Sequence, residues 1–221
     1  MLAVTSADSG IAALLRIRIA DGTIEKRWDL VPSPRGHVLG DLAVARNGDV
    51  YLTDSTEPFM YRLRANADTL ERIESPLFRS LQGVAPTADG RSVYVADYAH
   101  GLLVLDIASR RVRRLDDAPG STALGCDGIV LDRHGAIIAV QNGVSPARVM
   151  RFVIDKGRRR VIKATLLDRN LPIADEPTIG TIAGSRYVYV ANSAWEKYDD
   201  EGVRKAGVPL AEPVLLGIPL P

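Results

Sequence analysis

The segment GDVYLTD at residues 48–54 recurs three times, as RSVYVAD at 91–97, GAIIAVQN at 135–142 and RYVYVAN at 186–192. The last residues of these copies lie 43, 45 and 50 positions apart, and a weaker copy, LAVTS, stands at residues 2–6. Self-similarity at intervals of roughly 40–50 residues is typical of repeat proteins, and copies rich in short strands indicate propeller blades. We therefore predict an all-β chain that folds as a β-propeller.

Each full repeat predicts four strands. In the second unit they are 42–45, 50–54, 59–63 and 70–74, with the turn signal Asn47-Gly48 between the first two. The other predicted strands, in chain order, are 2–6, 14–19 and 24–30; 84–86, 93–97, 102–107 and 112–115; 128–131, 137–142, 149–154 and 161–167; and 178–183, 188–192 and 213–219. The first and last units therefore hold only three strands each.

The strand count bears on the number of blades. Six blades of four strands would hold about 24 strands, six more than the chain supplies. One additional N-terminal segment of roughly 55–65 residues would provide them. We therefore expect an incomplete six-bladed propeller whose first blade is missing, with an irregular five-unit ring as the alternative. Unpaired edges on the terminal blades would favour self-association.

The same reading divides the chain into blades of one propeller domain, residues 1–221. The predicted units are a partial blade 1–40, full blades 41–81, 82–126 and 127–176, and a three-stranded last blade 177–221.

Composition narrows the class of partner. The 28 Lys and Arg residues balance 27 Asp and Glu residues, so no nucleic-acid partner is expected. No run of 18 apolar residues occurs, which predicts no membrane span. The single cysteine, Cys126, excludes an internal disulfide and is interpreted as a small core residue. No signal peptide is recognised, and the compartment stays open between cytoplasmic, periplasmic and secreted.

A polar residue stands before each predicted inner strand. These residues are Asp41, Gln82, Asp127 and Glu176, spaced by 41, 45 and 49 positions. Inner strands line the central channel of a propeller, so four oxygen-bearing side chains are expected at one channel mouth. Clustered carboxylates are costly unless a cation or protons compensate, and Ca²⁺ prefers oxygen ligands. We predict a site for Ca²⁺ or another divalent cation; the alternative is that each residue caps its own turn.

Residues that close the second strands form another repeated set. Asp54, Asp97, Asn142 and Asn192 are expected to bond to their own loops. Candidates for contact with a small-molecule substrate at the top face are His37, Tyr98, His100, Asn142 and Trp195. The alternative for the histidines is a structural loop role, and for Trp195 a packed surface loop.

Three motifs resemble the gluconolactonase / regucalcin-like propellers over nearly the whole chain. They are GDLAV with DVYLTD at residues 40–54, LQGV at 81–84 and CDGI at 126–129. The resemblance implies six blades and one divalent cation, usually Ca²⁺, in the channel, held by Glu, Asn and Asp. Asp127 matches the family's Asp, which is also its usual general base. Gln82 stands where the family has the liganding Asn, Gly40 replaces the Asn beside Asp41, and the first-blade Glu has no counterpart.

These observations favour a metal-dependent hydrolase that acts on small lactones or esters. The cation would polarise the carbonyl and acidify a bound water, while Asp127 or Asp41 takes the proton. The alternative is a non-catalytic propeller that binds a ligand or protein, which Arg or Lys side chains at the channel would indicate. Without its first blade the chain is expected to be inactive under either function.

Overall fold

The computed structural model describes residues 1–6, 11–199 and 203–220. These residues form 18 strands in five antiparallel sheets and one short 3₁₀ helix, η1 (Trp195–Lys197). None of the helices in the described part of the chain is long and apolar enough to cross a membrane.

The first two sheets follow each other along the chain. The first contains β1 (Leu2–Ser6), β2 (Ala12–Ile17) and β3 (Ile24–Asp29). The second contains β4 (Leu39–Val44), β5 (Val50–Asp54), β6 (Phe59–Leu63) and β7 (Leu70–Glu74). Within each sheet neighbouring strands pair in sequence order, so each sheet is a simple up-and-down meander.

The remaining three sheets have the same order. The third contains β8 (Leu81–Pro86), β9 (Ser92–Asp97), β10 (Gly101–Asp106) and β11 (Val112–Arg114). The fourth contains β12 (Cys126–Leu131), β13 (Ile137–Gln141), β14 (Arg148–Ile154) and β15 (Val161–Arg169). The fifth contains β16 (Gly180–Ala183), β17 (Arg186–Val190) and β18 (Leu215–Pro219).

The repeated segment forms the second strand of each full sheet. Every residue of β5, β9 and β13 is buried. A strand buried on both faces requires apolar side chains at successive positions, which explains why the repeats read as continuous apolar runs. Their sequence similarity therefore reflects a shared position inside the molecule.

Four hydrophobic cores lie between neighbouring sheets. Leu14 and Leu52 belong to the core between the first and second sheets, whereas Tyr51 belongs to the core between the second and third. Two further cores join the third sheet to the fourth and the fourth to the fifth. Because successive strand residues point to opposite faces, adjacent residues such as Tyr51 and Leu52 serve different cores.

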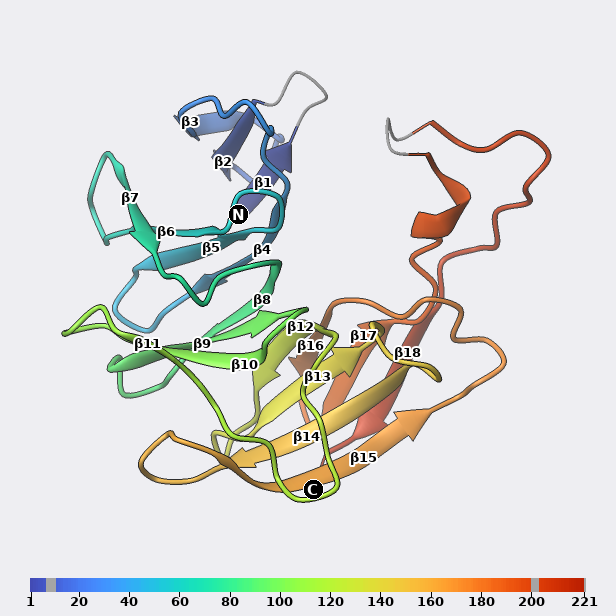
Figure 1. Ribbon diagram of the computed structural model, residues 1–221. Coiled ribbons are helices and arrows are strands. Elements are labelled where there is room, and N and C mark those ends of the chain that lie inside the picture. The colour runs from blue at the N-terminus through green and yellow to red at the C-terminus, as the bar shows by residue number, and fades with distance from the viewer. Residues whose placement is uncertain (7–10, 200–202, 221) are drawn as a thin grey trace.

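The first strands of the sheets lie side by side. β1 contacts β4, β4 contacts β8, β8 contacts β12 and β12 contacts β16. Figure 1 shows the sheets as an arc around these strands, with the first sheet (blue) at one end and the last (red) at the other. This arrangement of twisted meanders about shared inner strands is that of a β-propeller.

The prediction of an incomplete six-bladed propeller is wrong, because the structure has five blades. The strand pattern itself, with three strands in each terminal sheet and four in each middle sheet, is confirmed. The error came from treating the terminal sheets as incomplete blades. Three strands are enough for the first sheet to bury Ala12, Leu14 and Trp28 against the second.

Candidate active site

The inner strands share an irregularity at one level. Antiparallel pairing shifts register between Leu39 and Asp41 in β4, between Leu81 and Val84 in β8, and between Cys126 and Ile129 in β12. Such shifts redirect a side chain and are common next to active sites. Three of the predicted ligands, Asp41, Gln82 and Asp127, lie within these strands. The sequence had placed them ahead of the strands.

Two glycines allow the inner strands to approach closely at this level. A Cβ atom on Gly83 would lie 2.5 Å from the Asp127 carbonyl oxygen and from the Ile129 nitrogen. One on Gly128 would lie 2.7 Å from the Cα of Ile179. Real Cβ atoms do not come this near to backbone, so glycine is required for the spacing of the third, fourth and fifth sheets.

Asp127 is held by two side chains from other parts of the chain. Its Oδ2 accepts hydrogen bonds from Asn142 Nδ2 at 2.8 Å and from Thr178 Oγ1 at 2.7 Å. Asn142 also donates to the Pro177 carbonyl at 2.9 Å, and its Oδ1 accepts from the Tyr98 hydroxyl. Because Asn142 is bonded at both ends of its amide, its orientation and that of the Asp127 carboxylate are fixed.

Asp41 is a largely buried carboxyl. Its Oδ1 accepts a hydrogen bond from the backbone N–H of Leu42 at 2.8 Å. Its Oδ2 accepts one at 3.0 Å from the backbone N–H of Val84, on the neighbouring inner strand. Burial raises the pKa of Asp41 to about 6, and the charge of Asp127 acts in the same direction. The carboxyl can therefore exchange a proton near neutral pH, which suits an acid–base role.

The negative charge of Asp127 acts on two tyrosines, Tyr98 and Tyr187. Burial, and then the charge of Asp127, raises the pKa of Tyr98 to about 12 and raises that of Tyr187 as well. The Tyr187 hydroxyl is buried and has no hydrogen-bond partner among the residues that the structure describes. Sequence reasoning missed Tyr187 and Thr178, because Tyr187 lies within an apolar repeat and Thr178 belongs to no motif.

The other two predicted ligands have other partners. The Gln82 amide lies between the hydroxyls of Ser80 at 3.3 Å and Ser55 at 3.5 Å. Glu176 has left-handed backbone with φ of 61°, and its carboxylate accepts the backbone N–H of Glu196 at 3.3 Å. Glu176 thus supports the segment around η1.

Within residues 1–6, 11–199 and 203–220, no group of three or more His, Cys, Asp and Glu side chains is placed to hold a metal ion. The acidic residues present do not fit the predicted Ca²⁺ ligand set. The divalent cation remains a prediction.

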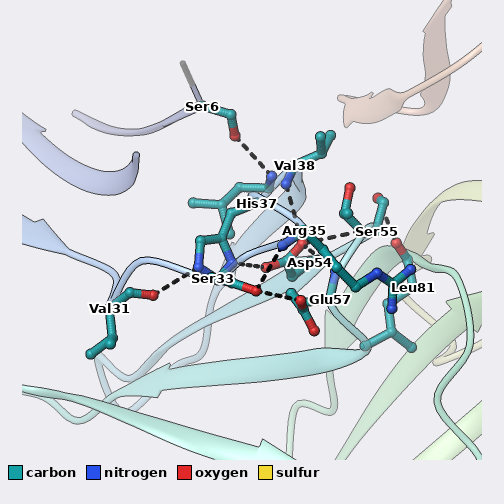
Figure 2. A network of polar contacts seen from close by, with 12 residues as sticks. Ser6, Val31, Ser33, Arg35, His37, Val38, Asp54, Ser55, Glu57 and Leu81 are labelled. Carbon is teal, nitrogen blue, oxygen red and sulfur yellow. Dashed lines mark hydrogen bonds and ion pairs between the residues drawn. The ribbon is translucent and has the colours of Figure 1, made fainter. Parts of the chain in front are cut away.

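The predicted substrate-binding residues fall into two groups. Tyr98 and Asn142 lie at Asp127, as described above. His37 instead lies in the polar network of Figure 2, where Nδ1 is 2.6 Å from Asp54 Oδ2 and Nε2 is 2.9 Å from the Val31 carbonyl oxygen. His100 Nδ1 contacts the Leu77 carbonyl at 2.7 Å. Trp195, on η1, is 70% exposed.

Side chains that close the second strands also separate into two kinds. As expected, three of them accept hydrogen bonds from backbone N–H groups of nearby loops: Asp54, Asp97 and Asn192. Asn142 departs from this pattern, because it bonds to Asp127 and to the segment before the fifth sheet. The departure marks Asn142 as part of the site.

Five meander sheets about shared inner strands, with two acidic residues on those strands, define a β-propeller with a candidate acid–base site. No protein-family model matches the sequence, and no curated protein matches it. A chain of the nidogen/laminin complex has a TM-score of 0.63 and 19% identity, covering 86% of this chain and 70% of that chain.

Two enzymes of known structure have the same fold. Virginiamycin B lyase from Staphylococcus aureus has a TM-score of 0.59 and 18% identity, and the match covers 84% of this chain and 61% of the lyase. Luciferin-regenerating enzyme has a TM-score of 0.61 and 15% identity, covering 99% of this chain and 73% of that enzyme. At these identities the comparisons show the propeller fold alone.

Proposed function

We propose that the chain is a hydrolase-like propeller that acts on small lactones or esters at Asp41 and Asp127. The observation that carries the proposal is an unequal pair of carboxyls. Asp127 is oriented by Asn142 and Thr178, whereas burial raises the pKa of the Asp41 carboxyl to about 6. Two acidic groups in different environments can divide the roles of base and acid.

The proposed reaction needs one water molecule. Asp127, as general base, takes a proton from water as the water oxygen forms a bond to the carbonyl carbon. Protonated Asp41 then gives its proton to the leaving oxygen as the carbon–oxygen bond of the lactone or ester breaks. Asp127 releases its proton to solvent and Asp41 takes one up before the next turnover. The products are a carboxylic acid and a hydroxyl group, joined in one hydroxy acid where the substrate is a lactone.

The surroundings of the pair favour this function over a non-catalytic binding module. Neither Asp41 nor Asp127 forms an ion pair with Arg or Lys in the part of the chain that the structure describes. Basic side chains at this point would have neutralised the carboxylates and favoured the binding function. The motif resemblance to gluconolactonase / regucalcin-like propellers points to the same substrate class.

The expected inactivity of the chain depended on a missing first blade. Since the structure has five blades, that reason no longer applies, and activity can be tested on the chain itself. Luciferin-regenerating enzyme and virginiamycin B lyase are named as enzymes with this fold, and they support an enzymatic function only by analogy.

The test is hydrolysis of a panel of γ- and δ-lactones and aryl esters by the purified chain. We expect turnover of at least one substrate, reduced roughly 100-fold or more in Asp127→Asn, as for loss of a general base. Asp116→Asn is the matched control, because Asp116 is exposed. Turnover that is equal in Asp127→Asn and Asp116→Asn, or no turnover of any substrate, would contradict the proposal.

The same assay with a chelator tests the predicted cation. Loss of turnover with chelator, restored by Ca²⁺ or another divalent ion, would support a metal-dependent reaction. Unchanged turnover would leave the acid–base pair as the catalytic unit.

A further inference from the structure

A cavity of about 740 Å³ lies between the first and second sheets, outside the candidate active site. It is lined by residues of β3, of the loop that follows it, and of β6 and β7. None of Asp41, Gln82, Asp127 and Asn142 lines it. Its volume falls within the range of small-molecule sites, roughly 300–1,000 Å³.

Three aromatic side chains, Trp28, Phe59 and Tyr61, contribute to the walls. Lys26 Nζ lies 4.9 Å from the ring centroid of Trp28, and Arg72 Cζ lies 4.5 Å from that of Phe59. The faces of aromatic rings attract cations electrostatically, so both rings are already engaged in this way. Tyr61 has no such cation among the described residues.

The charged side chains at the cavity are paired, with one exception. The pairs are Arg27 with Asp29 at 2.5 Å, Arg72 with Glu74 at 2.6 Å, and Lys26 with Asp68. Glu57 accepts a hydrogen bond from the Ser33 hydroxyl but has no basic partner within the described part of the chain. Its negative charge is therefore the one left uncompensated at this cavity.

His37 does not form an ion pair with Glu57, because its two ring nitrogens contact Asp54 and the Val31 carbonyl. The Val31 carbonyl can only accept a hydrogen bond, so the Nε2 atom of His37 carries a hydrogen. The other ring nitrogen, Nδ1, lies 2.6 Å from Asp54 Oδ2. Both ring nitrogens of His37 therefore contact groups other than Glu57, and Figure 2 shows Glu57 beside the His37–Asp54 pair.

Tyr61 and Glu57 act on each other electrostatically. Burial, followed by the charge of Asp54, raises the pKa of Tyr61 to about 12; Arg72, which lies opposite Tyr61 across β6 and β7, acts in the opposite direction, and Glu57 acts in the same direction as Asp54. Both the Tyr61 ring, over which no cation lies, and the Glu57 carboxylate, which forms no ion pair among the described residues, line this cavity. A small positively charged group would satisfy both.

We propose that this cavity binds a small organic cation, an ammonium group bearing an apolar or aromatic substituent. The ammonium group lies against the Glu57 carboxylate and the Tyr61 ring, and the substituent lies against Trp28 and Phe59. Aromatic side chains combined with a carboxylate are a known means of binding alkylated ammonium ions. The site is independent of the hydrolase proposal, because it uses none of its residues.

The probe is benzyltrimethylammonium, measured by isothermal titration calorimetry against benzyl alcohol and benzenesulfonate. We expect the cation to bind at least roughly tenfold more tightly than the other two, a difference of about 1.4 kcal/mol. Fluorescence of Trp28 gives a second readout in the Trp195→Phe background, since these are the two tryptophans of the chain. Equal binding of all three probes, or no binding of the cation, would overturn the proposal.

Variants locate the binding. Glu57→Gln keeps an acceptor for Ser33 and removes the charge, and we expect it to weaken cation binding roughly tenfold. Tyr61→Phe keeps the ring and is expected to bind nearly as well as the parent, whereas Tyr61→Leu is expected to bind poorly. Glu212→Gln, at an exposed carboxylate, is the matched control. Unchanged binding by a folded Glu57→Gln protein would refute the assignment.

Discussion

Asp41 combines two opposing influences on one carboxyl. Burial disfavours its charge, while the N–H groups of Leu42 and Val84 favour it, and burial dominates because the pKa is raised to about 6 from 3.8. The unfolded chain solvates this carboxyl and binds its proton less tightly. The position that supports acid–base chemistry therefore makes stability depend on pH.

We predict that the contribution of Asp41 to the free energy of unfolding falls as pH rises from about 4 to about 7. Because the folded-state pKa is raised, the contribution of Asp41 is present below the unfolded value near 3.8 and is lost as pH passes through about 6. The whole loss is about 3 kcal/mol, at about 1.4 kcal/mol per pKa unit, and about 2 kcal/mol of it falls between pH 4.5 and 7.5. Urea unfolding at pH 4.5 and 7.5 measures it.

Asp41→Asn removes this titration, so we expect the difference in unfolding free energy between pH 4.5 and pH 7.5 to shrink by about 2 kcal/mol. Comparing differences cancels the hydrogen bond that the substitution also changes. Asp116→Asn, at an exposed carboxylate, should retain the parent difference. An identical pH dependence in the parent and Asp41→Asn proteins would be inconsistent with a raised pKa.

At the scale of elements, the register shifts of β4, β8 and β12 connect fold to site. They occur at one level of three consecutive inner strands, and Gly83 and Gly128 let those strands approach there. Close approach brings Thr178, which precedes β16, to the Asp127 carboxylate. The site is therefore made by backbone geometry as much as by its acidic residues.

We predict that Gly83→Ala destabilises the chain by about 2 kcal/mol or more, within the range for overpacking. The added methyl group would lie 2.5 Å from two backbone atoms of β12, which cannot move without parting the third and fourth sheets. Gly157→Ala is the matched control, because its nearest neighbours are side-chain atoms of Asp155 and Arg159. Thermal and urea unfolding measure both variants, and equal stability would argue against the close approach.

The sequence predicted strands best where nothing interrupts the pattern of apolar residues. The predicted ranges 50–54, 59–63 and 70–74 coincide with β5, β6 and β7. The inner strands begin two or three residues earlier than predicted, at Leu39, Leu81 and Cys126. Polar residues and glycines at their register shifts interrupt the apolar pattern on which the prediction relied.

The candidate site was predictable only in part, for a related reason. Asp41 and Asp127 were recognisable because carboxylates recur at one place in the repeat. Thr178 and Tyr187 were not, because their roles depend on contacts between sheets that no local pattern encodes. Conversely, Glu176 shared the repeat position of Asp127, but its left-handed backbone and its bond to Glu196 give it another partner.

At the scale of the whole molecule, the four cores make stability a property of neighbouring sheets. Each middle sheet shares two cores, whereas among the described residues the first and fifth sheets share one each. In such arrays stability is approximately a sum over units and their interfaces. The terminal sheets also have features that would favour the self-association predicted from the sequence. These features are unpaired strand edges and exposed apolar residues such as Leu215, which is 66% exposed.

We predict that backbone amides of the terminal sheets exchange hydrogen faster than those of β9 and β13, which are buried throughout. Leu14→Ala, at a fully buried residue in the core between the first two sheets, should accelerate exchange in β1–β3 and leave β12–β15 nearly unchanged. Leu103→Ala, equally buried in β10, is the matched comparison and should accelerate exchange across the middle sheets. Hydrogen exchange with mass spectrometry of peptides measures both. A uniform acceleration in Leu14→Ala would mean that the five sheets unfold as one cooperative unit, and not sheet by sheet from the ends.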